Sequence, residues 1–209
     1  LSCITNAQPL ITNHQFNTYQ PELGTMDYDN VKIQIIDQPS LKSDNFDIGL
    51  VNNTDLIIIV VKNTEEIKNI QENYFQRSKA KQLIIFNKID LLNESEKRKI
   101  EAYLRSKKYN FVLTSAITKE GIKELKEKIF SNFDILRIYL KEPNKEPSNV
   151  PMIMRPGATI KDVADKISKQ MLPAIKEIHI WGPSSKFPNQ KVGLSHELKD
   201  KDIVEFRTR

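Results

Sequence analysis

The chain has 209 residues, of which 39% are hydrophobic and 28% are charged, a composition typical of a globular protein with one large or two small domains. Its longest apolar run, residues 56–61, has the length of a strand and is far shorter than the roughly 20 residues of a membrane-spanning helix. There is no signal-peptide pattern, and the single cysteine excludes an internal disulfide, so we expect a cytoplasmic protein that does not enter a membrane.

The first two thirds of the chain alternate between strand and helix patterns. Apolar runs predict strands at residues 31–37, 55–62, 82–86 and 110–116, and helical spacing predicts helices at residues 63–79, 93–108 and 119–133. Continuous apolar runs are typical of strands buried on both faces of a parallel sheet. The repeated strand–helix order therefore predicts a doubly wound α/β domain over residues 1–133.

The pattern changes at about residue 134. Strands are predicted at residues 135–141, 151–159, 177–181 and 202–208, and one helix is predicted at residues 159–171, with Thr159 and Asp162 at capping-box spacing. The order β-β-α-β-β resembles a ubiquitin-like β-grasp, so we expect a second domain at residues 134–209. This part holds 14 Lys and Arg against 10 Asp and Glu, a net charge of +4. Such a balance suits contact with RNA or another polyanion, and it suits a solvated Lys-rich surface equally well.

Polar residues follow the predicted strand at 82–86, in the stretch Asn-Lys-Ile-Asp. The Asp90 carboxylate can accept two hydrogen bonds from the N1–H and the amino group of guanine, a donor pair that adenine lacks. Asn87 can brace neighbouring loops, and the alkyl stem of Lys88 can lie over the base. We therefore predict that this loop selects guanine.

The next predicted strand ends in Thr-Ser-Ala, residues 114–116. Ligands gather at the carboxyl ends of the strands of an α/β sheet, so Ser115 and Ala116 are expected beside Asp90. There the backbone N–H of Ala116 can meet the O6 atom of guanine. Each motif is weak alone, but together, in this order and at strand ends, they indicate a GTP-binding fold.

A third strand end carries a candidate magnesium ligand. Asp37 ends the strand at 31–37, and a carboxylate at this place can hold Mg²⁺, usually through water, beside a γ-phosphate. Thr18 is the candidate for a second, mobile Mg²⁺ contact. No other metal is expected, because the three histidines do not show metal-ligand spacing. Cys3 is expected to be a buried helix residue.

The second domain offers candidate contacts for RNA or for a partner protein. In the strand at 177–181, Ile178 and Ile180 are expected to point inward and His179 and Trp181 outward. The candidate contacts are basic or aromatic side chains near this face: His179, Trp181, Lys186, Lys191, Arg207 and Arg209. The alternative for the tryptophan is a half-buried position under the loop at residues 185–190.

The motifs stand in an order that resembles a known family. The stretches ITNAQ, FNTYQPELGTMDYDNVKIQIIDQPS, NTDLIIIV, NKID and TSA follow the pattern of the developmentally regulated GTP-binding proteins, within the Obg-like GTPases. The stretches RPGATIKDVADKI and IWGPSSKFPNQKVGLSHELKDKDIVEFRT resemble the TGS domain of that family. The resemblance spans nearly the whole chain. It implies a P-loop-GTPase-like sheet, GTP and Mg²⁺ as ligands, work in translation or on ribosomes, and a stabilising partner protein.

The chain also departs from the family pattern. The Gly-rich phosphate loop that ends in Gly-Lys-Ser, which the resemblance places directly before Leu1, is absent from the sequence. Because the first residue is not Met, we expect this loop to be encoded upstream or supplied by a separate fragment. Ser40 stands where the family has a Gly whose backbone N–H donates to the γ-phosphate, so the resemblance implies a γ-phosphate contact at Ser40. Leu41 agrees with the apolar residue of the family, so hydrolysis would have to orient water by other means.

Two functions remain open at this point. The first is a GTP-binding switch protein whose complete form hydrolyses GTP, while this chain alone is inactive without the phosphate loop. The second is a split or degenerate GTPase that serves as a non-hydrolysing RNA- or protein-binding module through its TGS domain. The intact NKID and TSA motifs favour the first function, and Ser40 with the non-Met start favours the second.

Overall fold

The computed structural model describes residues 1–8, 18–74 and 80–208. The chain divides into two compact units. Unit 1 comprises residues 1–28 and 32–133, and unit 2 comprises residues 29–31 and 134–209. The main change of unit falls between Phe133 and Asp134, where the sequence pattern changes.

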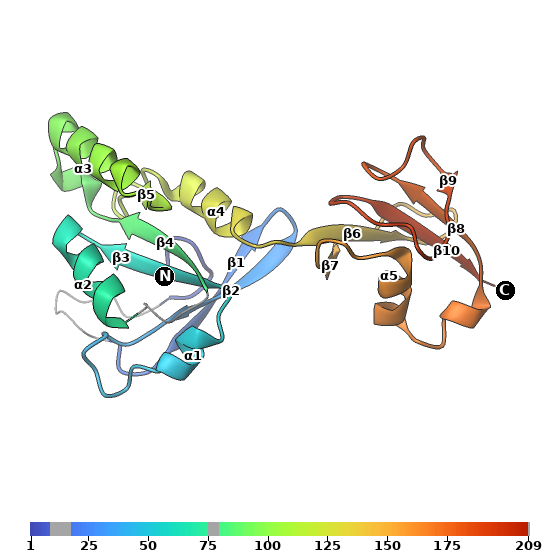
Figure 1. The fold of residues 1–209 in the computed structure, drawn as a ribbon, viewed down its shortest axis with the longest axis horizontal. Helices are drawn as coiled ribbons and strands as arrows, with labels where there is room; N and C mark the ends of the chain where they lie inside the picture. Colours follow the sequence, from blue (N-terminus) through green and yellow to red (C-terminus); the bar gives the residue numbers. More distant parts are fainter. Residues whose placement is uncertain (9–17, 75–79, 209) are drawn as a thin grey trace. The chain divides into compact units, whose positions relative to one another are not determined.

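Unit 1 contains a parallel three-stranded sheet with the order β3-β4-β5 (Figure 1). Its strands are β3 (Leu56–Val61), β4 (Lys81–Phe86) and β5 (Phe111–Leu113). The register pairs Ile59 with Ile84, and Phe86 with Leu113. The prediction of a parallel sheet is confirmed. The last strand is shorter than expected, because residues 114–116 already belong to the loop that follows it.

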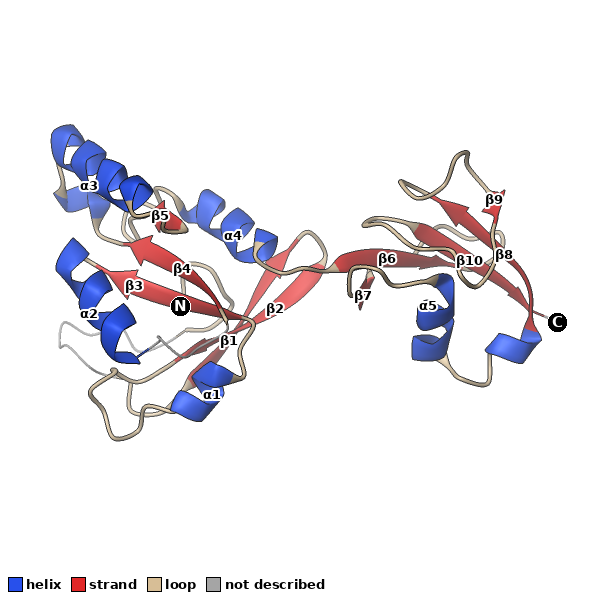
Figure 2. Ribbon diagram, viewed as in Figure 1, coloured by secondary structure: helices blue, strands red, loops and turns tan. Residues whose placement is uncertain are grey.

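Helices alternate with these strands along the chain, as the sequence predicts (Figure 2). They are α2 (Thr64–Tyr74), α3 (Glu94–Ser106) and α4 (Ile122–Ser131). Ile67 of α2 and Leu104 of α3 are fully buried in one core with Ile84 and Phe86 of β4. Leu83 and Ile85 are also buried, and they face the other side because side chains alternate along a strand. Strand β4 is therefore covered on both faces, as its continuous apolar run predicts.

The helix ends differ from the predicted ends by a few residues. α3 begins after Asn93, whose side chain accepts from the Glu96 N–H while the Glu96 side chain accepts from the Asn93 N–H, a capping box. α2 is described as far as Tyr74, and residues 75–79, which were predicted to continue it, lie outside the described residues.

A second, two-stranded sheet of unit 1 pairs β1 (Glu22–Tyr28) with β2 (Val31–Asp37). Asp29 and Asn30 between them both have positive φ, which Asp and Asn tolerate in a tight turn. The sequence predicts β2 but not β1, whose apolar alternation is broken by Gly24 and by charged residues at 22 and 27. The short helix α1 (Ile48–Asn52) follows, capped by Asp47, and was not predicted either.

Unit 2 has a five-stranded sheet with the order β7-β6-β10-β8-β9 (Figure 2). The strands are β6 (Leu136–Lys141), β7 (Met152–Met154), β8 (Ile175–Trp181), β9 (Gln190–Lys191) and β10 (Ile203–Thr208). β10 pairs in parallel with β6 and antiparallel with β8. Parallel pairing of the first and last long strands of this unit, with a helix between them in sequence, is the expected β-grasp arrangement.

The helix of unit 2, α5 (Ile160–Ile167), closes the core of that sheet. Ile160 and Val163 of the helix are fully buried in one cluster with Ile138, Ile178 and Ile180 of the strands. Thr159 caps the helix in a capping box with Asp162, as predicted. Within the described residues, no helix is both long enough and apolar enough to cross a membrane.

Candidate functional site

The loop after β4 is held in place by backbone hydrogen bonds at Asn87 and Ile89. The Asn87 N–H donates to the Val61 carbonyl over 2.8 Å, which carries the β3–β4 pairing one residue past the strand. Ile89 is buried, and its N–H donates to the Thr114 carbonyl over 3.2 Å. Lys88, between these anchors, has the left-handed φ of 65°, and its side chain is exposed. A non-glycine residue in this region is uncommon, and such residues often occur at functional loops.

The loop after β5 is buried at its start. Thr114 and Ser115 are 2% and 0% exposed, although their side chains are polar. The Ser115 N–H donates to the Glu120 carbonyl over 3.0 Å, and the Thr118 N–H donates to Ser115 Oγ over 3.1 Å. Gly121 closes the loop with a φ of 74°, where an added Cβ would stand 2.0 Å from the Leu113 carbonyl oxygen. This close approach requires glycine and keeps the loop folded over Ser115.

Side-chain hydrogen bonds join these two loops. Ser115 Oγ donates to Asp90 Oδ1 over 2.5 Å, and the Ala116 N–H donates to Asn87 Oδ1 over 3.2 Å. Thr114 Oγ1 lies 3.5 Å from the same Asn87 oxygen. Among the described residues, Ser115 is the only hydrogen-bond partner of Asp90, and Asp90 is exposed. The structure thus brings together Asn87, Asp90, Ser115 and Ala116, with Lys88 beside them.

Two exposed apolar side chains flank this cluster and were not predicted. Leu91 follows Asp90 and is 74% exposed, and Ile117 follows Ala116 and is 80% exposed. Large apolar side chains with such exposure, next to an exposed carboxylate, suit a ligand that has both an apolar face and hydrogen-bonding edges. The sequence signal was their position directly after the two motifs.

Cys3 contacts the same loop, contrary to expectation. Residues 1–6 form turns and not a helix, and Cys3 is half-buried, so its prediction as a buried helix residue is wrong. Its Sγ lies 3.6 Å from the Ala116 carbonyl oxygen, and Lys119 Nζ lies 3.2 Å from Sγ. The thiol therefore supports the loop after β5, and no sequence spacing indicated this contact.

Asp37 stands at the end of β2, half-buried. Burial raises the pKa of its carboxyl group above the usual range, and the nearby positive charge of the chain's amino terminus opposes that rise. A carboxylate that lacks full hydration gains from a bound cation, so the residue suits the predicted Mg²⁺ contact. No hydrogen bond among the described residues joins Asp37 to Thr18, which is also half-buried.

Ser40 opens a turn after β2. Its carbonyl accepts from the Ser43 N–H over 2.8 Å, and its Oγ lies 3.4 Å from the Lys42 nitrogen. Within the part of the chain that the structure describes, no group of three or more His, Cys, Asp or Glu side chains could hold a metal ion. Mg²⁺ commonly binds through one or two protein side chains with water and phosphate completing its shell, so the predicted contacts Asp37 and Thr18 need no larger group of ligands.

In unit 2 three of the predicted contacts are paired with two glutamates of the same sheet. Lys191 Nζ lies 2.6 Å from Glu177 Oε1, and Arg207 Nε donates to Glu205 Oε1 over 2.8 Å. His179 is only 9% exposed and hydrogen-bonds Glu177 over 3.3 Å. Its ring points away from the apolar core, as expected, but its burial argues against the predicted role as a stacking surface. Ile178 and Ile180 point into the core, as predicted.

The remaining predicted contacts of unit 2 differ in exposure. Trp181 is half-buried, with Lys141 Nζ 5.0 Å from its ring centre, a cation–π contact. Lys186 is exposed, and among the described residues its side chain has no hydrogen bond, while its backbone N–H donates to the Gln190 side chain. Arg209 lies outside the described residues. Lys186 is therefore the predicted basic contact that the structure leaves most open.

Comparison with known proteins fits this geometry. A family model described as RsgA GTPase matches residues 13–137. The chain belongs to the RsgA GTPase family. A second model, the TGS domain, matches residues 136–208, so unit 2 of this RsgA-family chain carries the predicted ubiquitin-like β-grasp.

The curated relatives of this family member are named GTP-binding proteins. A GTP-binding protein of Methanocaldococcus jannaschii is 39% identical over 123 residues, which are 58% of this chain and 32% of the relative. The developmentally regulated GTP-binding protein 2 homologue of Dictyostelium discoideum is 29% identical over 74% of this chain and 41% of its own length. The human developmentally regulated GTP-binding protein 2 is 27% identical over 59% of this chain and 33% of its own length. These names and the TGS match confirm the resemblance that the motifs indicate. The chain spans about a third to two fifths of these relatives.

Solved structures support the fold. A crystal structure of Era in complex with MgGDPNP and a segment of 16S ribosomal RNA aligns with a TM-score of 0.50 and 18% identity, over 81% of this chain and 62% of Era. An Aquifex aeolicus Era variant bound to GDP and aluminium fluoride aligns with a TM-score of 0.51 and 16% identity, over the same shares. At this level of identity the likeness concerns the fold, which is that of a P-loop GTPase G domain.

Proposed function

We propose that this chain recognises the guanine base of GTP, as part of a GTP-binding protein, through the joined loops after β4 and β5. The observation that carries the proposal is the pair of hydrogen bonds from Ser115 to Asp90 and from Ala116 to Asn87. These bonds hold two loops that are 25 or more residues apart in sequence in one arrangement, with the Asp90 carboxylate exposed.

Each residue of the cluster has a role in this proposal. Ser115 is the positioning residue, because its hydroxyl fixes one Asp90 oxygen and so orients the carboxylate toward the N1–H and amino group of guanine. The Ala116 N–H, which now donates to Asn87, turns or shares its hydrogen bond to meet guanine O6. The Lys88 stem and Ile117 supply apolar surface for the two faces of the ring.

The phosphate side of the nucleotide is assigned to the segment around β2. Asp37 would hold Mg²⁺, through water, with Thr18 as a second contact, and Ser40 would offer its N–H to a γ-phosphate. The ion neutralises phosphate charge when it is bound. The printed sequence has no Gly-Lys-Ser or Gly-Lys-Thr that would cradle the β- and γ-phosphates. We therefore expect the 209-residue polypeptide by itself to bind GTP weakly and not to hydrolyse it.

The proposal is tested by nucleotide titration of the 209-residue chain, followed by NMR. GTP and GDP should shift the amide signals of residues 87–91 and 115–117 with a dissociation constant near millimolar, about 4 kcal/mol, whereas ATP should not. Asp90→Asn should exchange the preference for guanine for one for xanthine, whose O2 carbonyl suits an amide donor. Asp44→Asn, at an exposed carboxylate outside the loops, is the control for charge loss. Equal responses to GTP and ATP would contradict the proposal.

A second role is favoured for unit 2. The TGS match and the excess of basic residues after residue 134 support the docking of this unit on ribosomal RNA during translation in the cytoplasm, with Lys186, Lys191, Arg207 and Trp181 as contacts. The alternative partners are a stabilising protein and a separate fragment that supplies the phosphate loop. This role can persist without hydrolysis, so the two proposals stand or fall separately.

A further inference from the structure

Helix α3 of unit 1 divides its side chains between two faces (Figure 1). On its inner face Leu104 is fully buried, and Ile100 packs against the same core. Its outer face consists of exposed residues three and four apart, which are neighbours on a helix. These residues are Ser95, Arg98, Lys99, Ala102, Arg105 and Ser106. Three of the six are cations and none is an acid, although residues 1–133 as a whole hold 18 Lys and Arg against 17 Asp and Glu.

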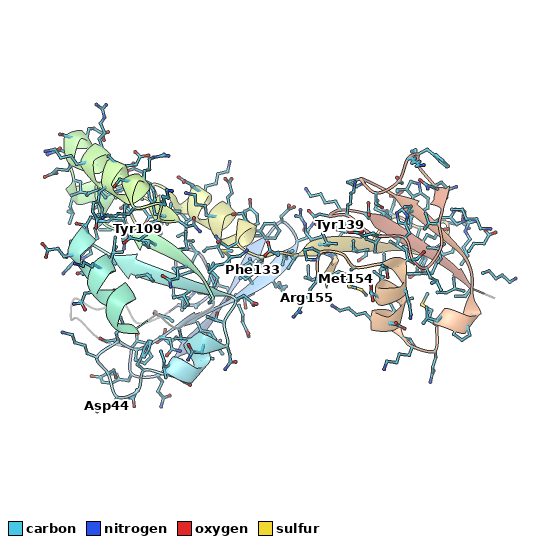
Figure 3. The ribbon with its side chains drawn as sticks, in the orientation of Figure 1. Asp44, Tyr109, Phe133, Tyr139, Met154 and Arg155 are labelled. Atoms are coloured by element: carbon cyan, nitrogen blue, oxygen red, sulfur yellow. The ribbon has the colours of Figure 1, made fainter. Side chains whose placement is uncertain are left out.

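The basic surface continues past the end of the helix. Lys108 has a left-handed φ of 56°, a conformation that favours glycine after a helix. The chain turns there, and Tyr109, which Figure 3 labels, donates its N–H to the Leu104 carbonyl over 3.1 Å and packs against the core. Lys107 and Lys108 are left exposed. A lysine is less stable than glycine in this conformation, so the fold gives no reason for a cation at position 108.

These cations, which we call the α3 patch, are Arg98, Lys99, Arg105, Lys107 and Lys108. Among the described residues, the only ion pair of the α3 patch joins Arg105 to Glu101 over 2.7 Å. The helix dipole stabilises cations in the last turn of a helix and just after it, but Arg98 and Lys99 lie in the first half of α3. Neither internal pairing nor the dipole therefore accounts for Arg98 and Lys99.

The chemistry of this surface fits the backbone of duplex RNA. Arg98 and Arg105 lie seven residues apart, about 10 Å along the helix axis, so together they can meet several phosphates of a strand. Ser95 and Ser106 add exposed hydroxyl groups, which can hydrogen-bond the 2′-hydroxyls that RNA displays in its shallow minor groove. The outer face has no aromatic side chain to stack on unpaired bases, so a single strand fits it less well.

Two other anionic partners fit less well than RNA. A helix that binds a membrane surface carries large apolar side chains beside its cations, whereas the only apolar residue on this outer face is Ala102. Protein interfaces are depleted of lysine and depend on buried aromatic or apolar anchors, which the outer face lacks as well. Free cations and hydroxyls with little apolar surface are typical of nucleic-acid contacts.

We propose that the outer face of α3, together with Lys107 and Lys108, binds the phosphate and 2′-hydroxyl groups of an RNA stem. Unit 1 then has an RNA-contact surface of its own, which is separate from the guanine site and additional to the RNA docking proposed for unit 2. The contact needs neither of them, because every cation of the α3 patch belongs to α3 and the two residues after it.

The test titrates the full 209-residue chain with an RNA duplex of mixed sequence at low salt and follows the binding by NMR. RNA should shift the amide signals of residues 95–108. The signals of unit 2 are read separately, so either RNA surface can fail without the other. A DNA duplex of the same sequence should bind α3 about threefold or more weakly, because it lacks the 2′-hydroxyls. Vesicles that contain anionic lipid should leave the α3 signals unchanged.

Two sets of variants separate the charge of the α3 patch from total charge and from folding. Arg98→Gln with Lys99→Gln should weaken the binding read at α3 by about tenfold and lower its salt dependence, while glutamine keeps the helix propensity. The matched control is Lys62→Gln with Lys123→Gln, which removes two exposed cations of unit 1 outside α3. Lys108→Gly should weaken binding in a unit that urea unfolding shows to be at least as stable.

The proposal has clear contrary outcomes. Unshifted α3 signals at low salt would overturn it, and so would equal losses from the two pairs of glutamine substitutions, because total charge would then govern binding. DNA bound as tightly as RNA would assign the surface to polyanions in general, and shifts caused by the vesicles would assign it to a membrane surface. Either result would overturn the proposal as well.

Discussion

The two units of this chain place their polar side chains differently. In unit 1, the polar groups of the candidate site stand at strand ends, in the loops after β4 and β5, where Asp90 has one described partner and Lys88 is exposed. In unit 2, they stand in the middle of strands. Glu205 of β10 is 1% exposed and is paired with Lys141 and Arg207, and Glu177 of β8 is paired with Lys191.

The difference shows which charges are available to a ligand. A charged side chain in mid-strand needs a partner of opposite charge on the neighbouring strand, because it is partly desolvated and like charges there are costly. A charged side chain after a strand end is positioned by the backbone, and its polar atoms stay available to hydrogen-bond a ligand. Net charge alone therefore overstates how well unit 2 can bind polyanions. It also understates how specifically unit 1 can bind a ligand.

The largest expected effect concerns two glycines with positive φ, Gly121 in unit 1 and Gly157 in unit 2. Gly121→Ala in unit 1 would bring a Cβ within 2.0 Å of the Leu113 carbonyl oxygen, while Gly157→Ala in unit 2 meets nothing within 4 Å. Both alanines are strained by a positive φ, but only Gly121→Ala adds a steric clash. We therefore expect the free energy of unfolding to fall by about 3 kcal/mol or more for Gly121→Ala and by about 1 kcal/mol for Gly157→Ala. Urea unfolding checks this, with Trp181 fluorescence for unit 2 and amide exchange of Leu125 and Ile129 for unit 1.

The two glycine variants also control each other. If Gly121→Ala lowers the free energy of unfolding no more than Gly157→Ala does, then close packing of the loop after β5 is not what keeps Ser115 in place. If the expected order holds, Gly121→Ala should also lose the nucleotide-induced shifts at residues 115–117, while Gly157→Ala should keep them.

A smaller effect is expected when the internal pairing of unit 2 is relaxed. Glu177→Gln removes the carboxylate that holds Lys191 at 2.6 Å and lies 4.0 Å from Arg207. Lys191 is freed, while Arg207 keeps its hydrogen bond to Glu205, so the affinity of the full chain for ribosomal RNA should rise by about threefold to tenfold at low salt, and added salt should remove the gain. Binding is measured by fluorescence anisotropy of labelled RNA at two salt concentrations.

Glu146→Gln is the matched control for this experiment, because it makes the same change in net charge at an exposed carboxylate outside the sheet. Equal gains from both variants would mean that total charge, and not release of Lys191, governs RNA binding. No binding at low salt by any of these proteins would contradict the RNA role of unit 2.

The smallest expected effect is an opposite pH dependence in the two units. Burial alone would raise the pKa of Asp200, but hydrogen bonds and the charge of Arg137 outweigh it, so its pKa lies below the usual range. Asp200 therefore stabilises unit 2 above the pKa of the unfolded chain, and this stabilisation is lost as pH falls through the lower pKa of the folded protein.

Asp37 has the opposite effect in unit 1. Burial raises the pKa of Asp37, so its charged form disfavours folding of unit 1 at neutral pH, and acidification relieves this.

Two variants measure these opposite signs in the absence of nucleotide and Mg²⁺. Asp37→Asn should raise the stability of unit 1 at pH 7 by about 0.5 kcal/mol or less, and should change nothing at acidic pH where the carboxyl is already neutral. Asp200→Asn should lower the stability of unit 2 at pH 7 and lose this effect in acid. Urea unfolding at pH 7 and near pH 3 gives both comparisons, and changes of the same sign would contradict the assigned environments.

The sequence predicted the elements whose pattern is continuous. The apolar runs of β3 and β4, the spacing of α3 and the Thr159 cap of α5 each determine their structure locally, and all four are found. β1 was missed because Gly24 and the charges at 22 and 27 interrupt its alternation, and its pairing with β2 depends on a turn between them.

The candidate site was predictable in its composition but not in its internal bonds. Asp90 and Ala116 stand where parallel strands end, and the topology of an α/β sheet brings such ends together. The left-handed φ of Lys88, the burial of Ser115 and the contact of Cys3 with Ala116 depend on packing between segments distant in sequence. The burial of His179 escaped prediction for the same reason, because its neighbour Lys191 comes from the two-residue strand β9.

Among the described strands β3 pairs only with β4, and the edge that this leaves uncovered has a consequence for the handling of this polypeptide. Its sequence, LIIIVV, combines high β-propensity with an absence of charge and proline, the composition of segments that stack into fibrils. Natural sheets protect such edges with lysine, proline or a bulge, and β3 has none of these. A concentrated stock of the free polypeptide is therefore prone to slow aggregation that starts from this hexapeptide, and a lysine at position 60 would act as a gatekeeper residue against it.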